Sequence, residues 1–196
     1  MKKIVLASTS IYRKILLEKM GLEFSTEKPT FDEDAAKIQL LKNNKSPLEI
    51  AEALSKGKAQ SIVAEGKLII AGDQIVNLNG QMIGKAGSQD KAHQQLQQMN
   101  GQRHELITAV TLRTSEKIIH LNHITQLFMK NLSDNELKNY LKKDAPFDSA
   151  GSYKIEESGL LLFDKIETDD FSAIQGLPLI WISQQLKGMG YELFKR

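Results

Sequence analysis

An aspartate stands directly after a short apolar run of the sequence. Residues 68–72, Leu-Ile-Ile-Ala-Gly, have the composition of a buried strand, and Asp73 follows them. Because open α/β sheets place ligands at the carboxyl ends of their strands, this carboxylate is a candidate for catalysis or metal binding. The alternative is an aspartate that only opens a turn. A catalytic role for Asp73 therefore requires other charged residues that could act with it.

Lys58 is the first cation that could serve such a carboxylate. Ser46, Pro47 and Glu49 form a helix start with a capping serine, a proline at the first helical position and a glutamate at the third, which predicts a helix over residues 47–65. Lys58 falls on the apolar stripe of this helix. Its ammonium group must either extend to solvent or meet an anion.

Arg13 lies in the first turn of a second predicted helix, over residues 11–20, and Ser8 and Ser10 precede it. Hydroxyl groups, the unpaired backbone N–H groups of a helix start and a guanidinium can converge there on one anion. The segment is therefore a candidate phosphate cradle. Many helices begin in this way, so the pattern alone does not select phosphate.

Lys85 follows a predicted β-hairpin whose turn is Asn79-Gly80. Gly84-Lys85 is similar to the end of a phosphate-binding P-loop, but that motif requires a glycine where Asn79 stands and serine or threonine where Ala86 stands. A P-loop is excluded. What remains is a lysine just after a hairpin strand, close in topology to Asp73.

Other catalytic classes lack their residues. The sequence contains no cysteine, which excludes disulfides, thiolate metal sites and cysteine nucleophiles, and it has no Gly-x-Ser-x-Gly motif. His120 and His123 are three apart in a predicted strand and so point to opposite faces, while His93 and His104 have no ligand-like spacing. A histidine metal site is not expected.

The composition is that of a globular protein without a bulk-electrostatic function. The 196 residues include 26 Lys+Arg and 24 Asp+Glu, a formal net charge of +2. No overall positive field would attract nucleic acid or an anionic membrane. No stretch approaches the ~18 consecutive apolar residues of a membrane span, and the start is too short for a signal peptide. We expect a single domain over residues 1–196, as one body or two lobes, in the cytoplasm.

The spacing of apolar residues predicts an α/β fold with a mixed sheet, because hairpins and helical crossovers both occur. Further helices are expected from Ser88, with Asn100-Gly101 closing it, from Ser133 to Lys143 and from Pro178 to about Gly190. Strands are expected at residues 4–7, 68–72, 105–113 and 117–130, with strand-like segments at residues 150–156 and 159–166. The shared parity of Ile118, Ile124 and Phe128 predicts that their face of the strand is buried.

Five motifs follow one another along the chain: Leu6-Ala7-Ser8-Thr9-Ser10 with Arg13, Ala71-Gly72-Asp73-Gln74, Gly84-Lys85, Ala150-Gly151-Ser152-Tyr153 and Gly176-Leu177-Pro178-Leu179. Together they resemble the Maf-like nucleoside triphosphate pyrophosphatases over nearly the whole chain. The resemblance implies an elongated α/β fold with a central mixed β-sheet flanked by helices and a deep central cleft. It relates the chain to the inosine triphosphatase-like fold and implies a homodimer as found for many members.

The resemblance also implies hydrolysis of a nucleoside triphosphate to the monophosphate and pyrophosphate with a divalent metal. Asp73 would activate a water for attack on the α-phosphorus, and Arg13, Lys58 and Lys85 would stabilise the developing charge. Glu33 matches an acidic position of the family and would share the metal with Asp73; the alternative for it is a solvated acidic loop. Carboxylate and phosphate oxygens suit Mg²⁺ or Mn²⁺.

Within the family, Gly72-Asp73-Gln74 and residues 152–156 are similar to the 7-methyl-GTP pyrophosphatase subgroup. Relatives acting on dTTP and UTP typically have threonine after the catalytic aspartate and glutamine at the position of Glu156. A carboxylate at Glu156 could accept the adjacent N1–H and N2–H donors of guanine. The ring of Tyr12 could stack on the cationic 7-methylpurine. Ser8, Ser10 and Gln74 complete the expected substrate-binding set.

The chain departs from the family pattern at four positions. Ile11 and Ala86 stand where the family has proline, Tyr12 where the subgroup has tryptophan, and Ser172 where asparagine is common. Two alternatives therefore stay open. One is the same reaction on dTTP, UTP or another modified nucleotide, and the other is a non-catalytic nucleotide-binding regulator of cell division in septum formation.

Overall fold

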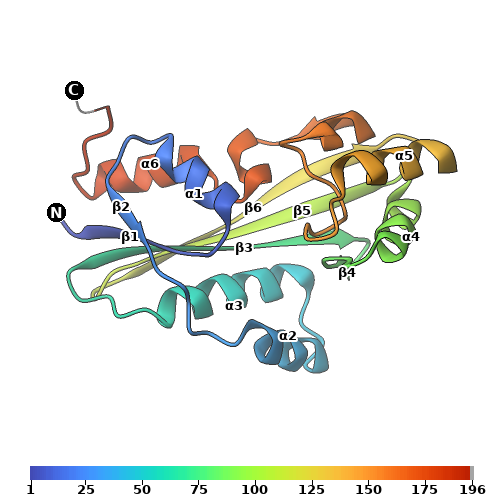
Figure 1. The fold of residues 1–196 in the computed structure, drawn as a ribbon. Helices are drawn as coiled ribbons and strands as arrows, with labels where there is room; N and C mark the ends of the chain where they lie inside the picture. The colour runs from blue at the N-terminus through green and yellow to red at the C-terminus, as the bar shows by residue number, and fades with distance from the viewer. Residues whose placement is uncertain (195–196) are drawn as a thin grey trace. The chain divides into compact units, whose positions relative to one another are not determined.

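A computed structural model gives the fold, and residues 1–194 are described (Figure 1). The strands of its seven-stranded sheet follow the order β2-β1-β3-β5-β6-β7, and β4 pairs with β3. β1 is parallel to β2 and β3, whereas the pairs β3–β4 and β6–β7 are antiparallel, so the predicted mixed sheet is confirmed. The strands are β1 (Lys3–Ala7), β2 (Phe24–Thr26), β3 (Lys67–Leu78), β4 (Gln81–Ile83), β5 (Arg103–Arg113), β6 (Ile118–Met129) and β7 (Phe163–Glu167). The helices are α1 (Ile11–Glu18), α2 (Glu33–Lys42), α3 (Pro47–Gln60), α4 (Gln89–Met99), α5 (Asp134–Asp144) and α6 (Leu179–Gly188), with 3₁₀ helices η1 (Ser158–Leu162) and η2 (Phe171–Gln175).

The chain divides into two compact units. The first unit comprises residues 1–73, 108–123 and 170 onward, and the second comprises residues 74–107 and 124–169. The strands β3, β5 and β6 contribute residues to both units, and along β3 the chain passes from the first to the second between Asp73 and Gln74. Within residues 1–194 no helix is long and apolar enough to cross a membrane.

Helices cover both faces of the sheet in the first unit, with α1 and α6 on one side and α3 on the other (Figure 1). Residues of β1 and β3 alternate between these faces, as the period of a strand requires. Side chains on the α1 and α6 side include those of Ile4, Leu6, Leu68 and Ile70. Those on the α3 side include Ala7, Ile69 and Ala71. Because both faces are buried, the two strands read as the continuous apolar runs found in the sequence.

The strand that carries Asp73 does not end before it. β3 runs from Lys67 to Leu78 without a break, and β4 pairs with its last three residues, 76–78, in the predicted hairpin. Placing Asp73 at a strand end was therefore wrong. Its parallel neighbour β1, however, does end at Ala7, in register with Ala71. The carboxyl end that matters for ligand placement is thus that of β1.

The buried face of β6 is opposite to the one predicted. Ile118 and Ile124 are exposed, whereas Thr125, Leu127 and Met129 are buried. Thr125 occupies a core position because its hydroxyl donates to Thr168 Oγ1 at 3.2 Å. A hydrogen-bonded threonine can face inward, so the parity of the isoleucines alone misassigned the strand.

Of the two strand-like segments predicted near the C-terminal third, the first is wrong and the second is confirmed only in its second half. Residues 150–156 form no strand beyond the single bridge at Ala150, because Gly151 and Ser152 both have positive φ angles, +74° and +57°, that interrupt an extended chain. The segment over residues 159–166 begins as the 3₁₀ helix η1, whose Gly159 N–H donates to the Lys154 carbonyl at 2.9 Å, and only then becomes β7. Both helices with capping boxes, α3 and α5, begin as predicted, although α3 ends at Gln60 and α1 at Glu18.

A ring cluster lies in the core of the second unit. His104, Tyr153 and Phe163 are buried, with ring centroids 5.2–5.7 Å apart. His104 Nε2 lies 3.3 Å from the Tyr153 hydroxyl, while its Nδ1 has no partner among the described residues. Burial lowers the pKa of His104 from 6.5 to about 4, because a charged imidazole would be desolvated there.

This burial predicts an acid-sensitive unit. Between pH 6.5 and 4 His104 is protonated in the unfolded chain but neutral in the folded chain. The free energy of unfolding should therefore decrease by roughly 1.4 kcal/mol for each unit by which the pH is lowered. Urea unfolding from pH 7 to 4 measures this slope. The His104→Gln variant should lose roughly 1.4 kcal/mol per pH unit of this slope. An unchanged slope would mean that the imidazole is not held neutral.

Candidate active site

A buried ammonium group joins two carboxylates in the first unit. Lys58 Nζ lies 2.7 Å from Asp73 Oδ1 and 2.7 Å from Glu33 Oε2. Lys58 and Asp73 are only 6% and 8% exposed, whereas Glu33 is exposed. Of the two possibilities for Lys58, extension to solvent and pairing with an anion, the structure shows the second. An ammonium group has three donors, so one remains for a further acceptor.

The main chain around Lys58 is fixed at the C-terminal end of α3. Arg113 on β5 reaches across and donates to the carbonyls of Ala59 and Ile62 at 2.9 and 2.8 Å. The last carbonyls of a helix have no partner within the helix, so a guanidinium there satisfies them and stabilises the last turn. Sequence reasoning missed Arg113, because nothing in its neighbourhood marks it as a partner of α3.

Arg13 on α1 is directed by backbone and hydroxyl acceptors. Its Nε donates to the Gly176 carbonyl at 3.2 Å, and one terminal nitrogen lies 3.5 Å from Ser8 Oγ. Ser10 caps α1, as its Oγ accepts from the Arg13 N–H at 3.4 Å. The predicted convergence of hydroxyl groups, a helix start and a guanidinium is thus present.

The electrostatic surroundings of Arg13 connect it to the carboxylates. Desolvation of the half-buried side chain lowers the pKa of Arg13, while the charges of Asp73 and Glu33 raise it. The guanidinium is therefore near enough to feel both carboxylates. Arg13, Lys58, Asp73 and Glu33 form one charged cluster, which we call the charged cluster below.

Two glycines leave room for the Arg13 side chain. A Cβ at Gly72 would lie 3.3 Å from Arg13 Nε, and one at Gly176 would lie 3.2 Å from it. Gly176 also adopts φ +115°, which L-residues rarely do. Its loop is held by the buried Asp170, which accepts from the Ile180 N–H at 2.7 Å. Gly176 is therefore required by its backbone conformation as well as by the Arg13 side chain, whereas a side chain at Gly72 would press on the guanidinium.

Ser172, the departure from the family's asparagine, belongs to the same loop. Its hydroxyl donates to Asp170 and accepts from the Leu179 N–H at 2.8 Å. Serine therefore still links the start of η2 to the start of α6. The substitution keeps the anchoring of the Gly176 loop.

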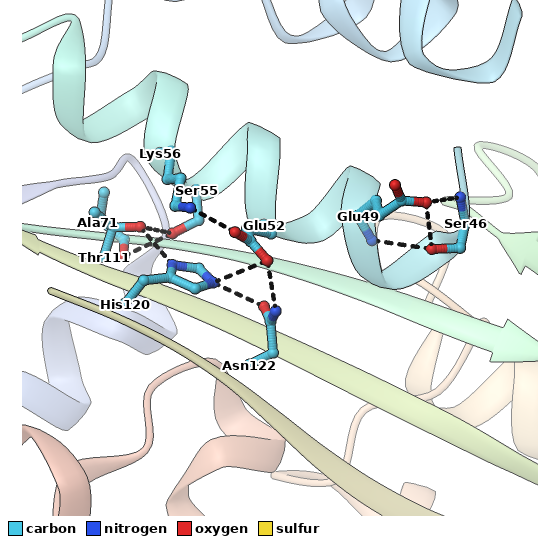
Figure 2. Close-up of polar contacts among 9 residues, drawn as sticks. All are labelled: Ser46, Glu49, Glu52, Ser55, Lys56, Ala71, Thr111, His120 and Asn122. Atoms are coloured by element: carbon cyan, nitrogen blue, oxygen red, sulfur yellow. Dashed lines mark hydrogen bonds and ion pairs between the residues drawn. The ribbon is translucent and has the colours of Figure 1, made fainter. Parts of the chain in front are cut away.

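A polar network supports the strand of Asp73 on the α3 side of the sheet (Figure 2). Its hydrogen bonds join Glu52, Asn122, His120, Thr111, Ser55 and the carbonyl of Ala71 in that order, at distances of 2.9–3.3 Å. Asn122 donates to Glu52, so its oxygen faces His120 Nε2, and this nitrogen must carry a proton. Ser55 and Thr111 are fully buried. The network fixes β3 two residues before Asp73.

Comparison with known proteins identifies the family. The family model described as Maf-like protein matches residues 3–189. The chain belongs to the Maf-like protein family. This membership confirms the resemblance carried by the five motifs, and the α/β fold agrees with it.

Several relatives of this family carry one name. A 7-methyl-GTP pyrophosphatase of Bdellovibrio bacteriovorus is 43% identical over 186 residues, which cover 95% of this chain and 96% of the relative. Proteins of the same name from Xanthomonas axonopodis and Aromatoleum aromaticum are 35% and 38% identical, covering 98% and 96% of this chain and 100% and 96% of the relatives. The alignments thus span nearly the full lengths of these family members.

In the second unit, two family motifs pair with each other. Lys85 forms an antiparallel bridge with Ala150, and the Gly87 N–H donates to the Phe147 carbonyl at 2.9 Å. Gln95 on α4 links both motifs, since its amide donates to the Gly84 carbonyl at 3.1 Å and accepts from the Ser152 hydroxyl at 2.6 Å. Gln95 was missed, because a single glutamine beside the buried face of an amphipathic helix carries no sequence signal.

The other residues predicted for the site are distributed over both units. Tyr12, on α1 in the first unit, and Gln74, on β3 in the second, are both half-buried. Lys85 and Glu156 in the second unit are exposed. Although the residue as a whole is exposed, desolvation of its carboxyl group raises the pKa of Glu156, and the charges of Glu157 and Asp148 add to this effect while that of Lys154 opposes it.

The donor set fits a divalent cation that substrate helps to bind. The carboxylates of Glu33 and Asp73 both contact Lys58 Nζ and so lie close together, and their oxygens are hard ligands. Within residues 1–194 no group of three or more acidic or histidine side chains could hold a metal alone. Mg²⁺ is commonly held by one or two carboxylates together with substrate phosphates, so the pair suffices.

Removing the ammonium group should destabilise the fold. Lys58→Met leaves the carboxylate of Asp73 buried without its ion-pair partner, which should lower the free energy of unfolding by about 3 kcal/mol. Urea unfolding in the absence of divalent metal measures this loss. The double variant Lys58→Met with Asp73→Asn should recover part of the stability, and no recovery would show that the two groups do not depend on each other.

Proposed function

We propose that this chain is a hydrolase that converts 7-methyl-GTP to 7-methyl-GMP and pyrophosphate, and so removes a modified nucleotide from the cytoplasm. The observation that carries the proposal is the charged cluster, in which the buried Lys58 ammonium holds Asp73 and Glu33 beside the Arg13 guanidinium. The names of the relatives supply the substrate, since three of them are 7-methyl-GTP pyrophosphatases.

Asp73 acts as the general base of this reaction. Lys58 binds Oδ1, which leaves Oδ2 to take a proton from water. The water oxygen forms a bond to the α-phosphorus while the bond from this phosphorus to the bridging oxygen of the β-phosphate breaks. Pyrophosphate leaves with that electron pair, and the proton remains on Asp73.

The cations stabilise the charge that develops on the phosphoryl oxygens. Phosphoryl transfer depends mainly on positioning and electrostatic stabilisation, because little covalent chemistry is left to the protein. Arg13 is oriented before substrate arrives by the Gly176 carbonyl and Ser8. Lys58 offers its third donor, and Lys85 is held by backbone pairing in the second unit. Ser8 and Ser10 offer hydroxyl groups to the same phosphates.

Glu33 and Asp73 would hold a Mg²⁺ or Mn²⁺ ion together with the substrate phosphates. When bound, the ion supplies further neutralisation of the phosphate oxygens. The protein residues named above orient the triphosphate and move the proton. We also propose that the protein forms a homodimer, as the family resemblance implies.

Recognition of the base is assigned to Glu156, Tyr12 and Gln74. Guanine offers two adjacent donors to the Glu156 carboxylate, whereas uracil and thymine have one donor flanked by carbonyls and would face it with acceptors. The cationic 7-methylpurine gains roughly 0.5–2 kcal/mol from a tyrosine face. Tyrosine gives less of this attraction than tryptophan, so the departure at Tyr12 should weaken binding without abolishing it.

The Asp73→Asn variant tests the base. The amide still accepts from Lys58 but cannot take the proton, so turnover of 7-methyl-GTP should fall at least ~100-fold. Malachite-green detection of phosphate with added inorganic pyrophosphatase measures it, with thermal unfolding as a control for folding. Full activity of the variant would contradict the assignment.

The same assay on a panel of triphosphates tests the reaction itself. Wild-type protein should prefer 7-methyl-GTP to dTTP and UTP. A preference for dTTP or UTP would keep the reaction and change the substrate. A blank panel with measurable nucleotide binding would instead support the non-catalytic regulator of cell division.

The Glu156→Gln variant tests specificity. Because a hydrogen bond to a charged group contributes about 1.5–3 kcal/mol, the preference for 7-methyl-GTP over UTP in kcat/KM should fall by about tenfold or more. The ratio is taken from the two substrates under identical conditions, so a loss of active protein cancels. An unchanged ratio would remove Glu156 from base recognition.

A further inference from the structure

The segment that carries Glu33 is fastened to α3 at successive residues. Thr30 Oγ1 donates to the Ser61 carbonyl at 3.3 Å, and Glu33 forms its ion pair with Lys58 at 2.7 Å. Between them, the ring of Phe31 lies against the backbone of Gly57, the residue before Lys58. The contacts of residues 30–33 therefore run along the last turns of α3.

The Phe31 ring occupies the place where a side chain at position 57 would stand. A Cβ built at Gly57 would lie 2.5, 2.6 and 2.8 Å from Cζ, Cε2 and Cε1 of Phe31. All three distances are far inside van der Waals contact, so any other residue would displace the ring. Gly57 lies inside α3, where glycine is less favourable than alanine by about 1 kcal/mol. The glycine is thus unfavourable for the helix and necessary for the ring.

The helix that begins at Glu33, α2, has no fully buried residue, although it lies against α3. None of the residues of α2, all within the described range, is buried, and Ile38 and Leu41 are exposed. Asp32 caps this helix by accepting from the Ala35 N–H at 2.9 Å, which fixes only its first turn. Besides the contacts between α2 and α3, the place of Glu33 is set by the contacts of the residues before it, among which the Phe31 ring has the largest apolar surface.

We propose that Gly57 is a positioning residue for the hydrolytic reaction. By admitting the Phe31 ring to α3, it places the Glu33 carboxylate on Lys58 and beside Asp73. This inference rests on the proposed function and adds a residue that does not touch the charged cluster through its own side chain. Displacement of the ring moves Glu33, and a catalytic group moved by about 1 Å loses much of its effect.

The variant Gly57→Ala tests this by activity. Its kcat with 7-methyl-GTP should fall about tenfold to a hundredfold. In the Glu33→Gln background the same substitution should change kcat by less than roughly twofold, since residues that act through one another are not additive. An equal loss in both backgrounds would overturn the proposal, because Gly57 would then not act through Glu33.

The matched control is Gly188→Ala. Gly188 ends α6, and a Cβ there would have no atom within 4 Å. This substitution should leave kcat unchanged and keep or raise the melting temperature. If Gly57→Ala behaved in the same way, position 57 would have no need of glycine and the proposal would fail.

Two measurements do not depend on activity. Gly57→Ala should lower the melting temperature in the wild-type chain but raise it by about 2–4 °C in the Phe31→Ala background, where the ring is absent. Hydrogen exchange of the α2 amides should become about tenfold faster in Gly57→Ala and stay unchanged in Gly188→Ala. Unaltered exchange in Gly57→Ala would overturn the proposal.

Failure of the proposed function gives a different result. If wild-type protein hydrolysed no triphosphate, the reaction assigned here would be wrong while the melting and exchange measurements still reported on the Phe31 ring. If wild-type protein were active and Gly57→Ala equally so, the reaction would stand and only the role of Gly57 would be lost.

Discussion

The structure of the first unit depends on one buried cation. The Lys58 ammonium is almost removed from water and must have anions within reach, because an unpaired charge at that depth is strongly unfavourable. Asp73 and Glu33 supply them from a strand and from the first turn of a helix. The same requirement concentrates two carboxylates in one place, where they attract the Arg13 guanidinium and offer oxygen ligands to a divalent cation. The burial of Lys58 thus accounts both for the balance of charges in the cluster and for its ability to bind a metal and a phosphate.

The rest of the unit holds these groups by backbone contacts that tolerate little change. Arg113 binds the last carbonyls of α3, the hydroxyl and imidazole network supports β3 at Ala71, and the Gly176 carbonyl orients Arg13. Such supports make a site rigid before substrate binds, and phosphoryl transfer benefits from rigid, preorganised charges. In the second unit Gln95 does the same for Lys85 by joining two family motifs.

Sequence patterns predicted the features that follow from local chemistry. The buried strands were evident as apolar runs, and the capping serines Ser46 and Ser133 gave both helix starts. The five motifs predicted the family, which the comparisons confirm. Lys58, predicted from its place on a helix stripe, and Glu33, implied by the resemblance, lie with Asp73 in one ion-pair cluster of the first unit. Features set by distant contacts could not be predicted: α2 has no apolar stripe, Thr125 is buried through a hydrogen bond, and the need for Gly57 arises from a ring 26 positions away in the sequence. Asp73 was placed at the wrong point of its strand because the hairpin extends β3 past it.

The most direct test is an experimental structure of the Asp73→Asn variant with 7-methyl-GTP and Mn²⁺. The account predicts that the α-phosphate contacts Lys58 and Arg13, with anomalous signal from Mn²⁺ beside Glu33. Density for the triphosphate on another surface, without contact to Lys58, would contradict the claim that this buried ammonium and its two carboxylates form the hydrolytic site.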